Sequence, residues 1–503
     1  MEVSIRADLC CDSVYSYLKL RASQPVAWSA LMQYDNVGRP AHQRVRHNGR
    51  TLLDKSYLWG DNLRLLQTLD TINRRSVRYD YDTFGSLSGA VYGDGSCQWR
   101  NPDAMGNVYD SPDRTDRSYG RGGQLREDRK WRYYYDSHGN LVLKTMRRSG
   151  PSLETGMRDE FLAWQSGDYA YTWQGNGMLR SVTRPDGKTV TFKYDALGRR
   201  IEKVFDGRVY RYLWDGDVII HEWEYAEADR PNTVVTETGE GTLDRPEPVE
   251  NLITWVYEEG SYVPVAKLQN GERYTIISDY MGRPVEAYKS YGTVVWQADY
   301  DIYGDLRNIK DIRDFIPFRQ LGQYEDDETR LYYNRFRYYD PRIGNYISQD
   351  PISLAGNNPT LYGYVRDLNK RTDLFGLSEL VYQLLNSDNE VVYYGITSRT
   401  ADERWLEHLA NPEKNGKIAK MQVLAEGLNH DQARSIEGAL IRKRLAEHID
   451  DYSATDSIKD QLKKSNLLNK NRGRVKERWT SENPLEELKN KMHKKPKDVG
   501  CKL

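Results

Sequence analysis

The sequence predicts a multidomain protein, in which an all-β region with an extended antiparallel sheet is followed by a small α/β domain. Turn signals recur between alternating, aromatic-rich segments, and most of the 38 Tyr and 12 Trp residues lie there. The 126 residues after Leu377 differ in character, because they are rich in Lys, Leu and Asn and show helical patterns. A chain of 503 residues has room for about two to four domains.

Residues 79–307 contain the repeats that predict the sheet. Each repeat has an Asp and a Gly three residues later, where the carboxylate can bond the turn backbone and the Gly can take a positive φ angle. The flanks alternate polar residues with Val, Tyr, Thr and Trp, as half-buried strands do. Hairpins repeated about every 20 residues form an architecture in which neighbours bury one another's faces. The repeats read YDTFGSL at 81–87, YYDSHGNLV at 134–142, FKYDALGRR at 192–200, SDYMGRPVEA at 278–287 and YDIYGDLR at 300–307.

The net charge gives no indication of a partner, because 73 Lys and Arg nearly cancel 74 Asp and Glu. Residues 459–503 hold 14 basic and 6 acidic side chains, which fits either a segment that binds nucleic acid or a solvated end. Neither metal-ligand spacing nor the density of a disulfide scaffold is seen for Cys10, Cys11, Cys97 and Cys501. No run of about 18 apolar residues and no cleavable signal is visible, so we expect no membrane span and, for any export, a specialised route.

Two stretches interrupt and then end the repeats. Residues 224–250 contain Asp, Glu, Thr, Gly and three prolines, and predict a surface loop or insertion. Residues 338–377 carry a dense signature: Tyr-Tyr-Asp-Pro at 338–341, Asp-Pro-Ile at 350–352, Leu-Ala-Gly at 354–356 and Asp-x-x-Gly-Leu at 373–377. This signature resembles the core of the Rhs/YD-repeat family.

The resemblance implies three domains: a partial YD-repeat β shell over 1–315, an Rhs-associated core with a self-cleavage junction over 316–377, and a toxin domain over 378–503. It also implies aspartyl-type autoproteolysis after Leu377 by Asp350 and Asp373. Two carboxyl groups held close cannot both ionise, so one can act as the acid while the other activates water. From the residues alone, the alternative is that both Asp side chains cap turns.

After the junction the sequence predicts a compact α/β domain. Residues 380–397 read as two short apolar strands around Asn-Ser-Asp-Asn, hence a hairpin. A capping box at 400–403 opens a helix, a third strand follows at 418–425, and a second helix runs from about 429 to 448. Glu437 lies on or beside the apolar stripe of that helix, where a buried carboxylate needs a cation or a metal ion. The alternative is a boundary residue paired with Arg434 or Arg444.

The order and spacing of polar residues in this domain are similar to those of GIY-YIG nucleases. Leu380-Val381-Tyr382 and Tyr393-Tyr394-Gly395 match the two signatures, and their tyrosines Tyr382 and Tyr393 are 11 residues apart. The residues that match the later positions are Thr397, Arg404, His408, Glu437 and Asn469, with Asn466 as an alternative to Asn469.

The resemblance implies a metal-dependent DNase with Mg²⁺ or another divalent cation on Glu437. Phosphodiester hydrolysis needs an activated water, positive charge at the phosphoryl oxygens and a proton for the leaving oxygen. Tyr382, helped by His408, would activate the water, and Arg404 would bind phosphate through its planar guanidinium. Tyr393 and Asn469 complete the implied catalytic set, while Gly395 and Thr397 are implied to bind substrate. The alternative is that the tyrosines are ordinary strand aromatics and His408 is a surface residue.

We therefore expect an Rhs-type antibacterial toxin that hydrolyses DNA. It would be made in a bacterial cytoplasm, exported by a specialised system such as type VI secretion, and active in the cytoplasm of a competing cell. Its expected partners are DNA, a cognate immunity protein and a secretion-system component. Two alternatives are a YD-repeat binding or adhesion module with a non-catalytic tail, and a nuclease directed at RNA.

Overall fold

The computed structural model describes residues 3–10, 13–20, 28–60, 64–147, 163–236, 239, 241–351, 360–374, 376, 379–397, 404–405, 408–409, 411, 414, 416–428, 430–447, 461–462, 465, 467 and 492–499. The chain forms two compact units. The first comprises residues 1–333, 339–347 and 363–371, and the second comprises 334–338, 348–362 and 372–503. Segment 316–377, predicted as one domain, is thus shared between the two units.

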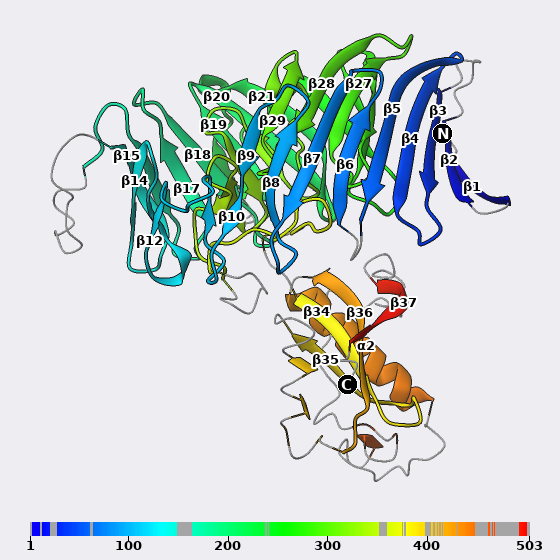
Figure 1. The fold of residues 1–503 in the computed structure, drawn as a ribbon. Helices are drawn as coiled ribbons and strands as arrows, with labels where there is room; N and C mark the ends of the chain where they lie inside the picture. The colour runs from blue at the N-terminus through cyan, green and yellow to red at the C-terminus, as the bar shows by residue number, and fades with distance from the viewer. Residues whose placement is uncertain are drawn as a thin grey trace. The chain divides into compact units, whose positions relative to one another are not determined.

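Two large antiparallel sheets build the first unit, and within each sheet the strands are paired in chain order (Figure 1). The nine-stranded sheet contains β1 (Val3–Cys10), β2 (Ser13–Leu20), β3 (Trp28–Tyr34), β4 (Pro40–His47), β5 (Arg50–Trp59), β6 (Leu65–Asp70), β7 (Arg75–Tyr81), β8 (Leu87–Tyr92) and β9 (Cys97–Trp99). A separate pair follows, β10 (Asn101–Pro102) with β11 (Val108–Tyr109).

The sixteen-stranded sheet confirms the predicted extended antiparallel sheet. It contains β12 (Ser118–Tyr119), β13 (Leu125–Glu127), β14 (Trp131–Tyr135), β15 (Leu141–Met146), β16 (Tyr169–Trp173), β17 (Leu179–Thr183), β18 (Thr189–Tyr194), β19 (Arg200–Phe205), β20 (Arg208–Asp215), β21 (Val218–Ala226), β24 (Glu250–Tyr257), β25 (Pro264–Gln269), β26 (Glu272–Ser278), β27 (Pro284–Lys289), β28 (Val294–Tyr300) and β29 (Leu306–Lys310). Short 3-10 turns are η2 (Arg121–Gly123), η4 (Glu227–Asp229) and η5 (Arg313–Phe315).

The repeated Asp-x-x-Gly turns explain why these segments pair with their neighbours. In the turn at 82–86, Asp82 Oδ1 accepts hydrogen bonds from the amides of Phe84 and Ser86, and Gly85 has a φ of 82°. An Asp side chain can therefore close each turn by itself, while Gly supplies the left-handed conformation. The same arrangement recurs at 103–107, 136–140, 195–199, 279–283 and 301–305, and also at 35–39, which lies before the predicted repeat region.

The predicted insertion at 224–250 is present as a small exposed hairpin. Its strands are β22 (Thr233–Val235) and β23 (Gly241–Leu243), which pair only with each other among the described strands. The large sheet continues across it, because β21 pairs directly with β24. The composition of this stretch thus predicted correctly that an insertion separates two neighbouring strands of the sheet in the sequence.

The two large sheets contact each other through side chains that the turns place at matching positions. Gln43 donates to the carbonyl of Ser278 at 2.7 Å, and Gln98 donates to Asp301 at 2.9 Å. Trp28 packs edge-on against Tyr288 with ring centroids 5.4 Å apart. The facing surfaces of the sheets therefore carry hydrogen bonds and aromatic contacts as well as aliphatic packing.

Residues 324–346 form a four-stranded sheet of short buried strands: β30 (Tyr324–Asp326), β31 (Leu331–Asn334), β32 (Arg337–Asp340) and β33 (Asn345–Tyr346). Buried ion pairs tie this segment to distant strands, with Arg200 and Asp326 at 2.6 Å and Lys144 and Asp340 at 3.1 Å. Removing one partner of a buried pair leaves an uncompensated charge, so these contacts strongly favour one position of the segment.

In the second unit, a four-stranded antiparallel sheet in the order β35-β34-β36-β37 packs on a helix (Figure 1). Its elements are β34 (Glu379–Leu385), β35 (Val391–Thr397), β36 (Lys420–Leu428), β37 (Met492–Val499) and α2 (His430–Ala446). The predicted hairpin, third strand and second helix are thus confirmed, and the α/β character of the domain with them. β37 was not predicted, because the sequence around it reads as a basic tail.

Alternation along β34 sends neighbouring side chains to opposite faces of this sheet. Val381 belongs to a core cluster with Ile436, Leu440 and Ile441 of α2. Tyr382 belongs to a second cluster on the other face, with Trp405. The two faces are therefore covered by different parts of the chain, and Tyr382 lies on the face away from the core that α2 forms.

Candidate nuclease site and self-cleavage junction

Tyr382 is fully buried on β34, one of the two inner strands of the four-stranded sheet. Its partner across the sheet is Gly395 of β35. A Cβ atom at position 395 would lie 2.5 Å from Cζ and Oη of Tyr382 and 2.7 Å from the ring of Tyr393. Gly395, predicted to bind substrate, therefore makes room for both tyrosine rings.

Tyr382, Arg404 and His408 form one hydrogen-bonded cluster. Arg404 Nε donates to Tyr382 Oη at 2.9 Å, and His408 Nε2 lies 2.7 Å from the same oxygen. Tyr393 adds its ring to the cluster, with its centroid 6.1 Å from that of Tyr382 and 5.4 Å from that of His408. The structure thus brings together four of the residues that the sequence singled out.

The pKa values of this cluster show how burial affects its charge states. Burial raises the pKa of Tyr382, the nearby Tyr393 adds to the rise, and the charge and hydrogen bond of Arg404 oppose it. Burial, together with the charges of Lys414 and Arg404, lowers the pKa of His408 to about 3. At neutral pH His408 is therefore an uncharged imidazole inside a cationic environment.

Lys414 is a residue of this site that the sequence reasoning missed. Its Nζ lies 3.1 Å from His408 Nδ1 and 3.3 Å from the ring centroid of Tyr393. A lysine in an irregular loop carries no periodicity and matched no residue of the motif. Its position six residues after His408 was the one signal in the sequence, and it is a weak one.

Glu437 is half-buried on α2, and its charge raises the pKa of Tyr393 after the larger effect of burial. Among the described residues no group of three or more His, Cys, Asp or Glu side chains converges on one point. A single carboxylate fits Mg²⁺, which keeps several water ligands and is commonly held by one or two carboxylates and the phosphate of a substrate. The residues present therefore fit a one-carboxylate magnesium site.

Three predicted site residues lie partly or wholly outside the described part of the chain. Asn469 and its alternative Asn466 are not among the described residues, and neither is Leu377. Thr397 is the last residue of β35 and pairs with Leu380, but its side chain is not described. Their predicted roles stay predictions.

The two aspartates of the junction share one arginine. Asp350 and Asp373 are 4% and 3% exposed, and Nη2 of Arg337 lies 2.9 Å from Oδ2 of Asp350 and 3.2 Å from Oδ2 of Asp373. Sequence reasoning predicted the carboxylates and missed the arginine. Arg337 precedes the Tyr-Tyr-Asp-Pro signature directly, and a charged residue inside a run of aromatics was the available signal.

The backbone just before Leu377 is held in place by the same cluster. Arg337 Nε donates to the carbonyl of Gly376 at 2.6 Å, and Asn334 Nδ2 donates to the carbonyl of Asp373 at 2.7 Å. Gly376 has a φ of 66°, and a Cβ there would lie 2.8 Å from the carbonyl oxygen of Asn334. Position 376 therefore requires glycine for both its conformation and its space.

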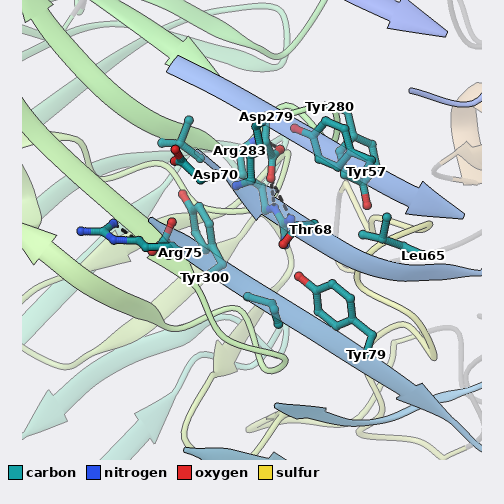
Figure 2. A pocket seen from close by; sticks show the side chains of 14 residues that line it. Tyr57, Leu65, Thr68, Asp70, Arg75, Tyr79, Asp279, Tyr280, Arg283 and Tyr300 are labelled. Atoms are coloured by element: carbon teal, nitrogen blue, oxygen red, sulfur yellow. Dashed lines mark hydrogen bonds and ion pairs between the residues drawn. The ribbon is translucent and has the colours of Figure 1, made fainter. Parts of the chain in front are cut away.

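The first unit contains a small cavity between its sheets, shown in Figure 2. It measures about 40 Å³, space for a few water molecules. Four of its charged side chains form two ion pairs, Asp279 with Arg283 at 2.7 Å and Arg75 with Asp299 at 2.9 Å (Figure 2). These pairings and its size make the cavity a part of the packing between the sheets.

No helix in the described part of the chain has the length and apolarity that a membrane crossing requires.

Two family models match consecutive parts of this chain. The family model of the teneurin YD-shell matches residues 18–364, and that of the GIY-YIG catalytic domain matches residues 379–450. The crystal structure titled TcdB2-TccC3-TEV aligns with 73% of this chain and 23% of its own, at 16% identity and a TM-score of 0.38.

Two curated relatives carry different activities in their names. Double-stranded DNA deaminase toxin A of Burkholderia cenocepacia (strain H111) is 30% identical over 375 residues, which cover 69% of this chain and 24% of that protein. Probable deoxyribonuclease RhsB of Dickeya dadantii (strain 3937) is 31% identical over 264 residues, which cover 51% and 16%. The chain spans about a quarter or less of the length of these relatives. Because the shell family matches more than half of it, the chain belongs to the teneurin YD-shell family, and a GIY-YIG catalytic domain follows the shell.

Proposed function

We propose that the GIY-YIG domain is a metal-dependent endonuclease that cuts DNA. The observation that carries the proposal is the cluster of Tyr382, Arg404 and His408, in which a guanidinium and an imidazole each lie within hydrogen-bond distance of the phenol oxygen. These groups match the needs of phosphodiester hydrolysis, namely a base for the attacking water and a fixed positive charge for the phosphoryl oxygens.

In this reaction the oxygen of a water molecule bonds to phosphorus, and the bond from phosphorus to the 3′ oxygen breaks. Tyr382, as the phenolate, would orient the water and take its proton, and the leaving 3′ oxygen would take up a proton from solvent. Arg404 would bind a phosphoryl oxygen, in addition to its bond to Tyr382. Glu437 would hold Mg²⁺, which supplies positive charge for the leaving oxygen when bound. Burial of Tyr382 excludes bulk water from the site. The lower local dielectric strengthens each of these electrostatic interactions.

DNA is the substrate we favour, and RNA is the alternative. The name of the Dickeya dadantii relative contains deoxyribonuclease, which supports the choice. Another relative, of Bacillus subtilis (strain 168), is named tRNA nuclease WapA and is 28% identical over 246 residues. The choice between the polymers therefore depends on direct incubation with each.

The experiment is incubation of the purified chain with supercoiled plasmid, and separately with tRNA, in Mg²⁺ or in EDTA. We expect nicking of plasmid in Mg²⁺ and none in EDTA. Glu437→Gln keeps the size of the side chain and should lower the rate by about 100- to 1,000-fold. Glu447→Gln is the matched control, since Glu447 follows the same helix, is exposed and pairs with Arg444. A folded Glu437→Gln protein that cuts at the parent rate would refute the nuclease assignment.

We also propose that the chain cuts itself after Leu377 at the junction. The support is that Arg337 contacts both Asp350 and Asp373 and also holds the carbonyl of Gly376, one residue before the cleavage position. One carboxyl would activate the attacking water and the other would protonate the leaving amine of Ser378. The products are a new carboxyl at Leu377 and a new amine at Ser378.

Mass spectrometry of the purified protein tests self-cleavage. A fragment that begins at Ser378 is expected from the parent, and Asp373→Asn should abolish it. Asp388→Asn, in the exposed turn of the β34–β35 hairpin, is the control and should leave the fragment unchanged. Cleavage that persists in Asp373→Asn would exclude the aspartyl mechanism.

The two activities together make the chain a toxin of competition between bacteria, in which the shell accompanies a nuclease that self-cleavage frees. The proposed course is synthesis in a bacterial cytoplasm, export by a specialised secretion system and action in the cytoplasm of a target cell. A cognate immunity protein and a component of the secretion system are the proposed protein partners. A producer strain that survives without any neutralising protein while it makes active nuclease would contradict this part of the proposal.

A further inference from the structure

Backbone hydrogen bonds link His408 to described residues that follow it in the chain. The amide of Asn411 donates to the carbonyl of His408 at 3.2 Å, and the amide of Lys414 donates to the carbonyl of Asn411 at 3.0 Å. A third bond, from the amide of Lys417 to the carbonyl of Lys414 at 3.0 Å, continues the series. The backbone therefore fixes where the side chain of Lys414 begins.

The end of that side chain contacts two rings of the site. Lys414 Nζ lies 3.1 Å from His408 Nδ1, and it lies over the face of Tyr393 at 3.3 Å from the ring centroid. An ammonium group over an aromatic face gains a cation–π attraction, which holds it there. Two contacts and the backbone hydrogen bonds together give Lys414 a defined position.

This geometry determines which nitrogen of His408 carries a proton. An ammonium group has three donors and no acceptor, so His408 Nδ1 must be the acceptor in the bond from Lys414. A neutral imidazole has one protonated nitrogen, and it must then be Nε2. His408 Nε2 lies 2.7 Å from Tyr382 Oη, so the imidazole donates to the phenol oxygen.

Tyr382 Oη consequently receives two N–H donors, Nε2 of His408 and Nε of Arg404 at 2.9 Å. Its own proton is then directed to the remaining neighbour, the hydroxyl of Tyr393, to which Tyr382 is hydrogen-bonded. Two donors aimed at one oxygen stabilise the phenolate, and so oppose burial and the bond to Tyr393, which favour the phenol. His408 is thus arranged to stabilise the charge on Tyr382, and not to accept its proton.

We propose that Lys414 is a positioning residue, which fixes the Nε2-protonated tautomer of His408 so that His408 and Arg404 jointly stabilise the phenolate of Tyr382. The catalytic part of this inference rests on the proposed nuclease function. The tautomer itself is a property of the resting protein and can be measured without substrate.

The charged and titratable groups around His408 come from every element packed against it. They are Arg404 on its own helical turn, Lys414 on the loop, Tyr382 on β34 and Tyr393 on β35, with Glu437 of α2 acting on Tyr393. Both cations oppose protonation of the imidazole, as its burial does, so the ring stays neutral through the physiological range.

The direct test is nitrogen-15 NMR of the full chain labelled at its 8 histidines, with the His408 signals assigned by their loss in His408→Gln. In the parent, we expect His408 with a bare Nδ1 and a protonated Nε2. In Lys414→Met, which keeps the length of the side chain and removes the donor, the Nδ1-protonated form should appear. Lys414→Arg should restore the parent tautomer. A parent His408 protonated at Nδ1, or a Lys414→Met protein with an unchanged tautomer, would overturn the proposal.

Plasmid cleavage separates this proposal from the nuclease assignment. Lys414→Met should lower the rate at neutral pH by about 10- to 100-fold, the range for a group that orients an active-site histidine. Without the charge of Lys414, the pKa of His408 should rise toward its ordinary value of about 6.5, and the cleavage rate should then depend on pH in that range. Loss of packing alone does not produce this pH dependence. Lys417→Met is the matched control, because Lys417 is exposed on the same loop. A parent that shows the expected tautomer and cuts no nucleic acid refutes the nuclease function alone, while an active parent with the other tautomer refutes the role of Lys414 alone.

Discussion

Gly395→Ala tests whether the position of the Tyr382 ring determines the activity of the site. The added Cβ would lie 2.5 Å from Cζ and Oη of Tyr382, so the ring must retreat by about 0.9 Å to reach the ordinary contact distance of 3.4 Å. Tyr382 has no exposed surface into which it can move. Its hydrogen bonds to His408 and Arg404, now 2.7 and 2.9 Å, would be stretched toward or past the limit of about 3.2 Å.

The expected costs follow from these distances. Overpacking of a filled core typically costs about 1–3 kcal/mol of unfolding free energy. A catalytic group displaced by about 1 Å can lose about 100-fold in rate. Gly395→Ala should therefore unfold at lower denaturant concentration and cut plasmid about 100-fold more slowly while it is still folded.

Plasmid cleavage and urea unfolding, measured on the same preparations, check this prediction. Gly175→Ala is the matched control, because Gly175 has an ordinary φ and a Cβ added there would have no other atom within 4 Å. A Gly395→Ala protein with parent stability and parent rate would show that the ring of Tyr382 tolerates displacement, and the account of the site would be wrong.

Three further outcomes follow from the same contacts. Arg404→Lys keeps the charge and loses the planar guanidinium that bonds Tyr382, so cleavage should fall about 10-fold or more in a plasmid assay, with an unchanged melting temperature as the control. Arg337→Lys keeps the charge but cannot reach Asp350, Asp373 and the Gly376 carbonyl together, so the fragment seen by mass spectrometry should decrease, and an undiminished fragment would exclude a role for the guanidinium. Below pH 6.5 the unfolded chain binds a proton at His408, whereas the folded chain binds it only near pH 3. The free energy of unfolding should therefore fall by up to about 1.4 kcal/mol per pH unit as the pH is lowered. Hydrogen exchange of β34 peptides measures this slope, which His408→Gln should remove.

Local patterns were enough to predict most of the fold. Each Asp-x-x-Gly turn is closed by its own side chain, so the pairing of successive strands could be inferred from short stretches. The hairpin at 380–397 and the helix near Glu437 were readable for the same reason, because they depend on alternation and on helical spacing. β37 was missed, since its pairing with β36 depends on a strand more than 60 residues away.

The site was predictable only where a motif fixed the spacing of its residues. Tyr382, Arg404 and His408 lie on regular elements at known intervals. The structure places Arg404 and His408 within hydrogen-bond distance of the Tyr382 oxygen. Lys414 enters through an irregular loop, and Arg337 enters through a strand that returns to the junction, so no period in the sequence connects either residue to its partners. Contacts of this kind are set by tertiary packing.

The ordering of strands in the first unit has a consequence for how the chain folds. Strands that pair with their sequence neighbours need only short loop closures, so the two large sheets can grow hairpin by hairpin, even while the chain is still being made. Segment 316–371 differs, because Arg100 bonds the carbonyl of Arg366 across 266 residues and Lys144 bonds Asp340 across 196. Such distant contacts can form only when the sheets already exist. Residues 339–347 and 363–371 should therefore be fixed last, and refolding should show a fast phase for the sheets and a slow one for this segment.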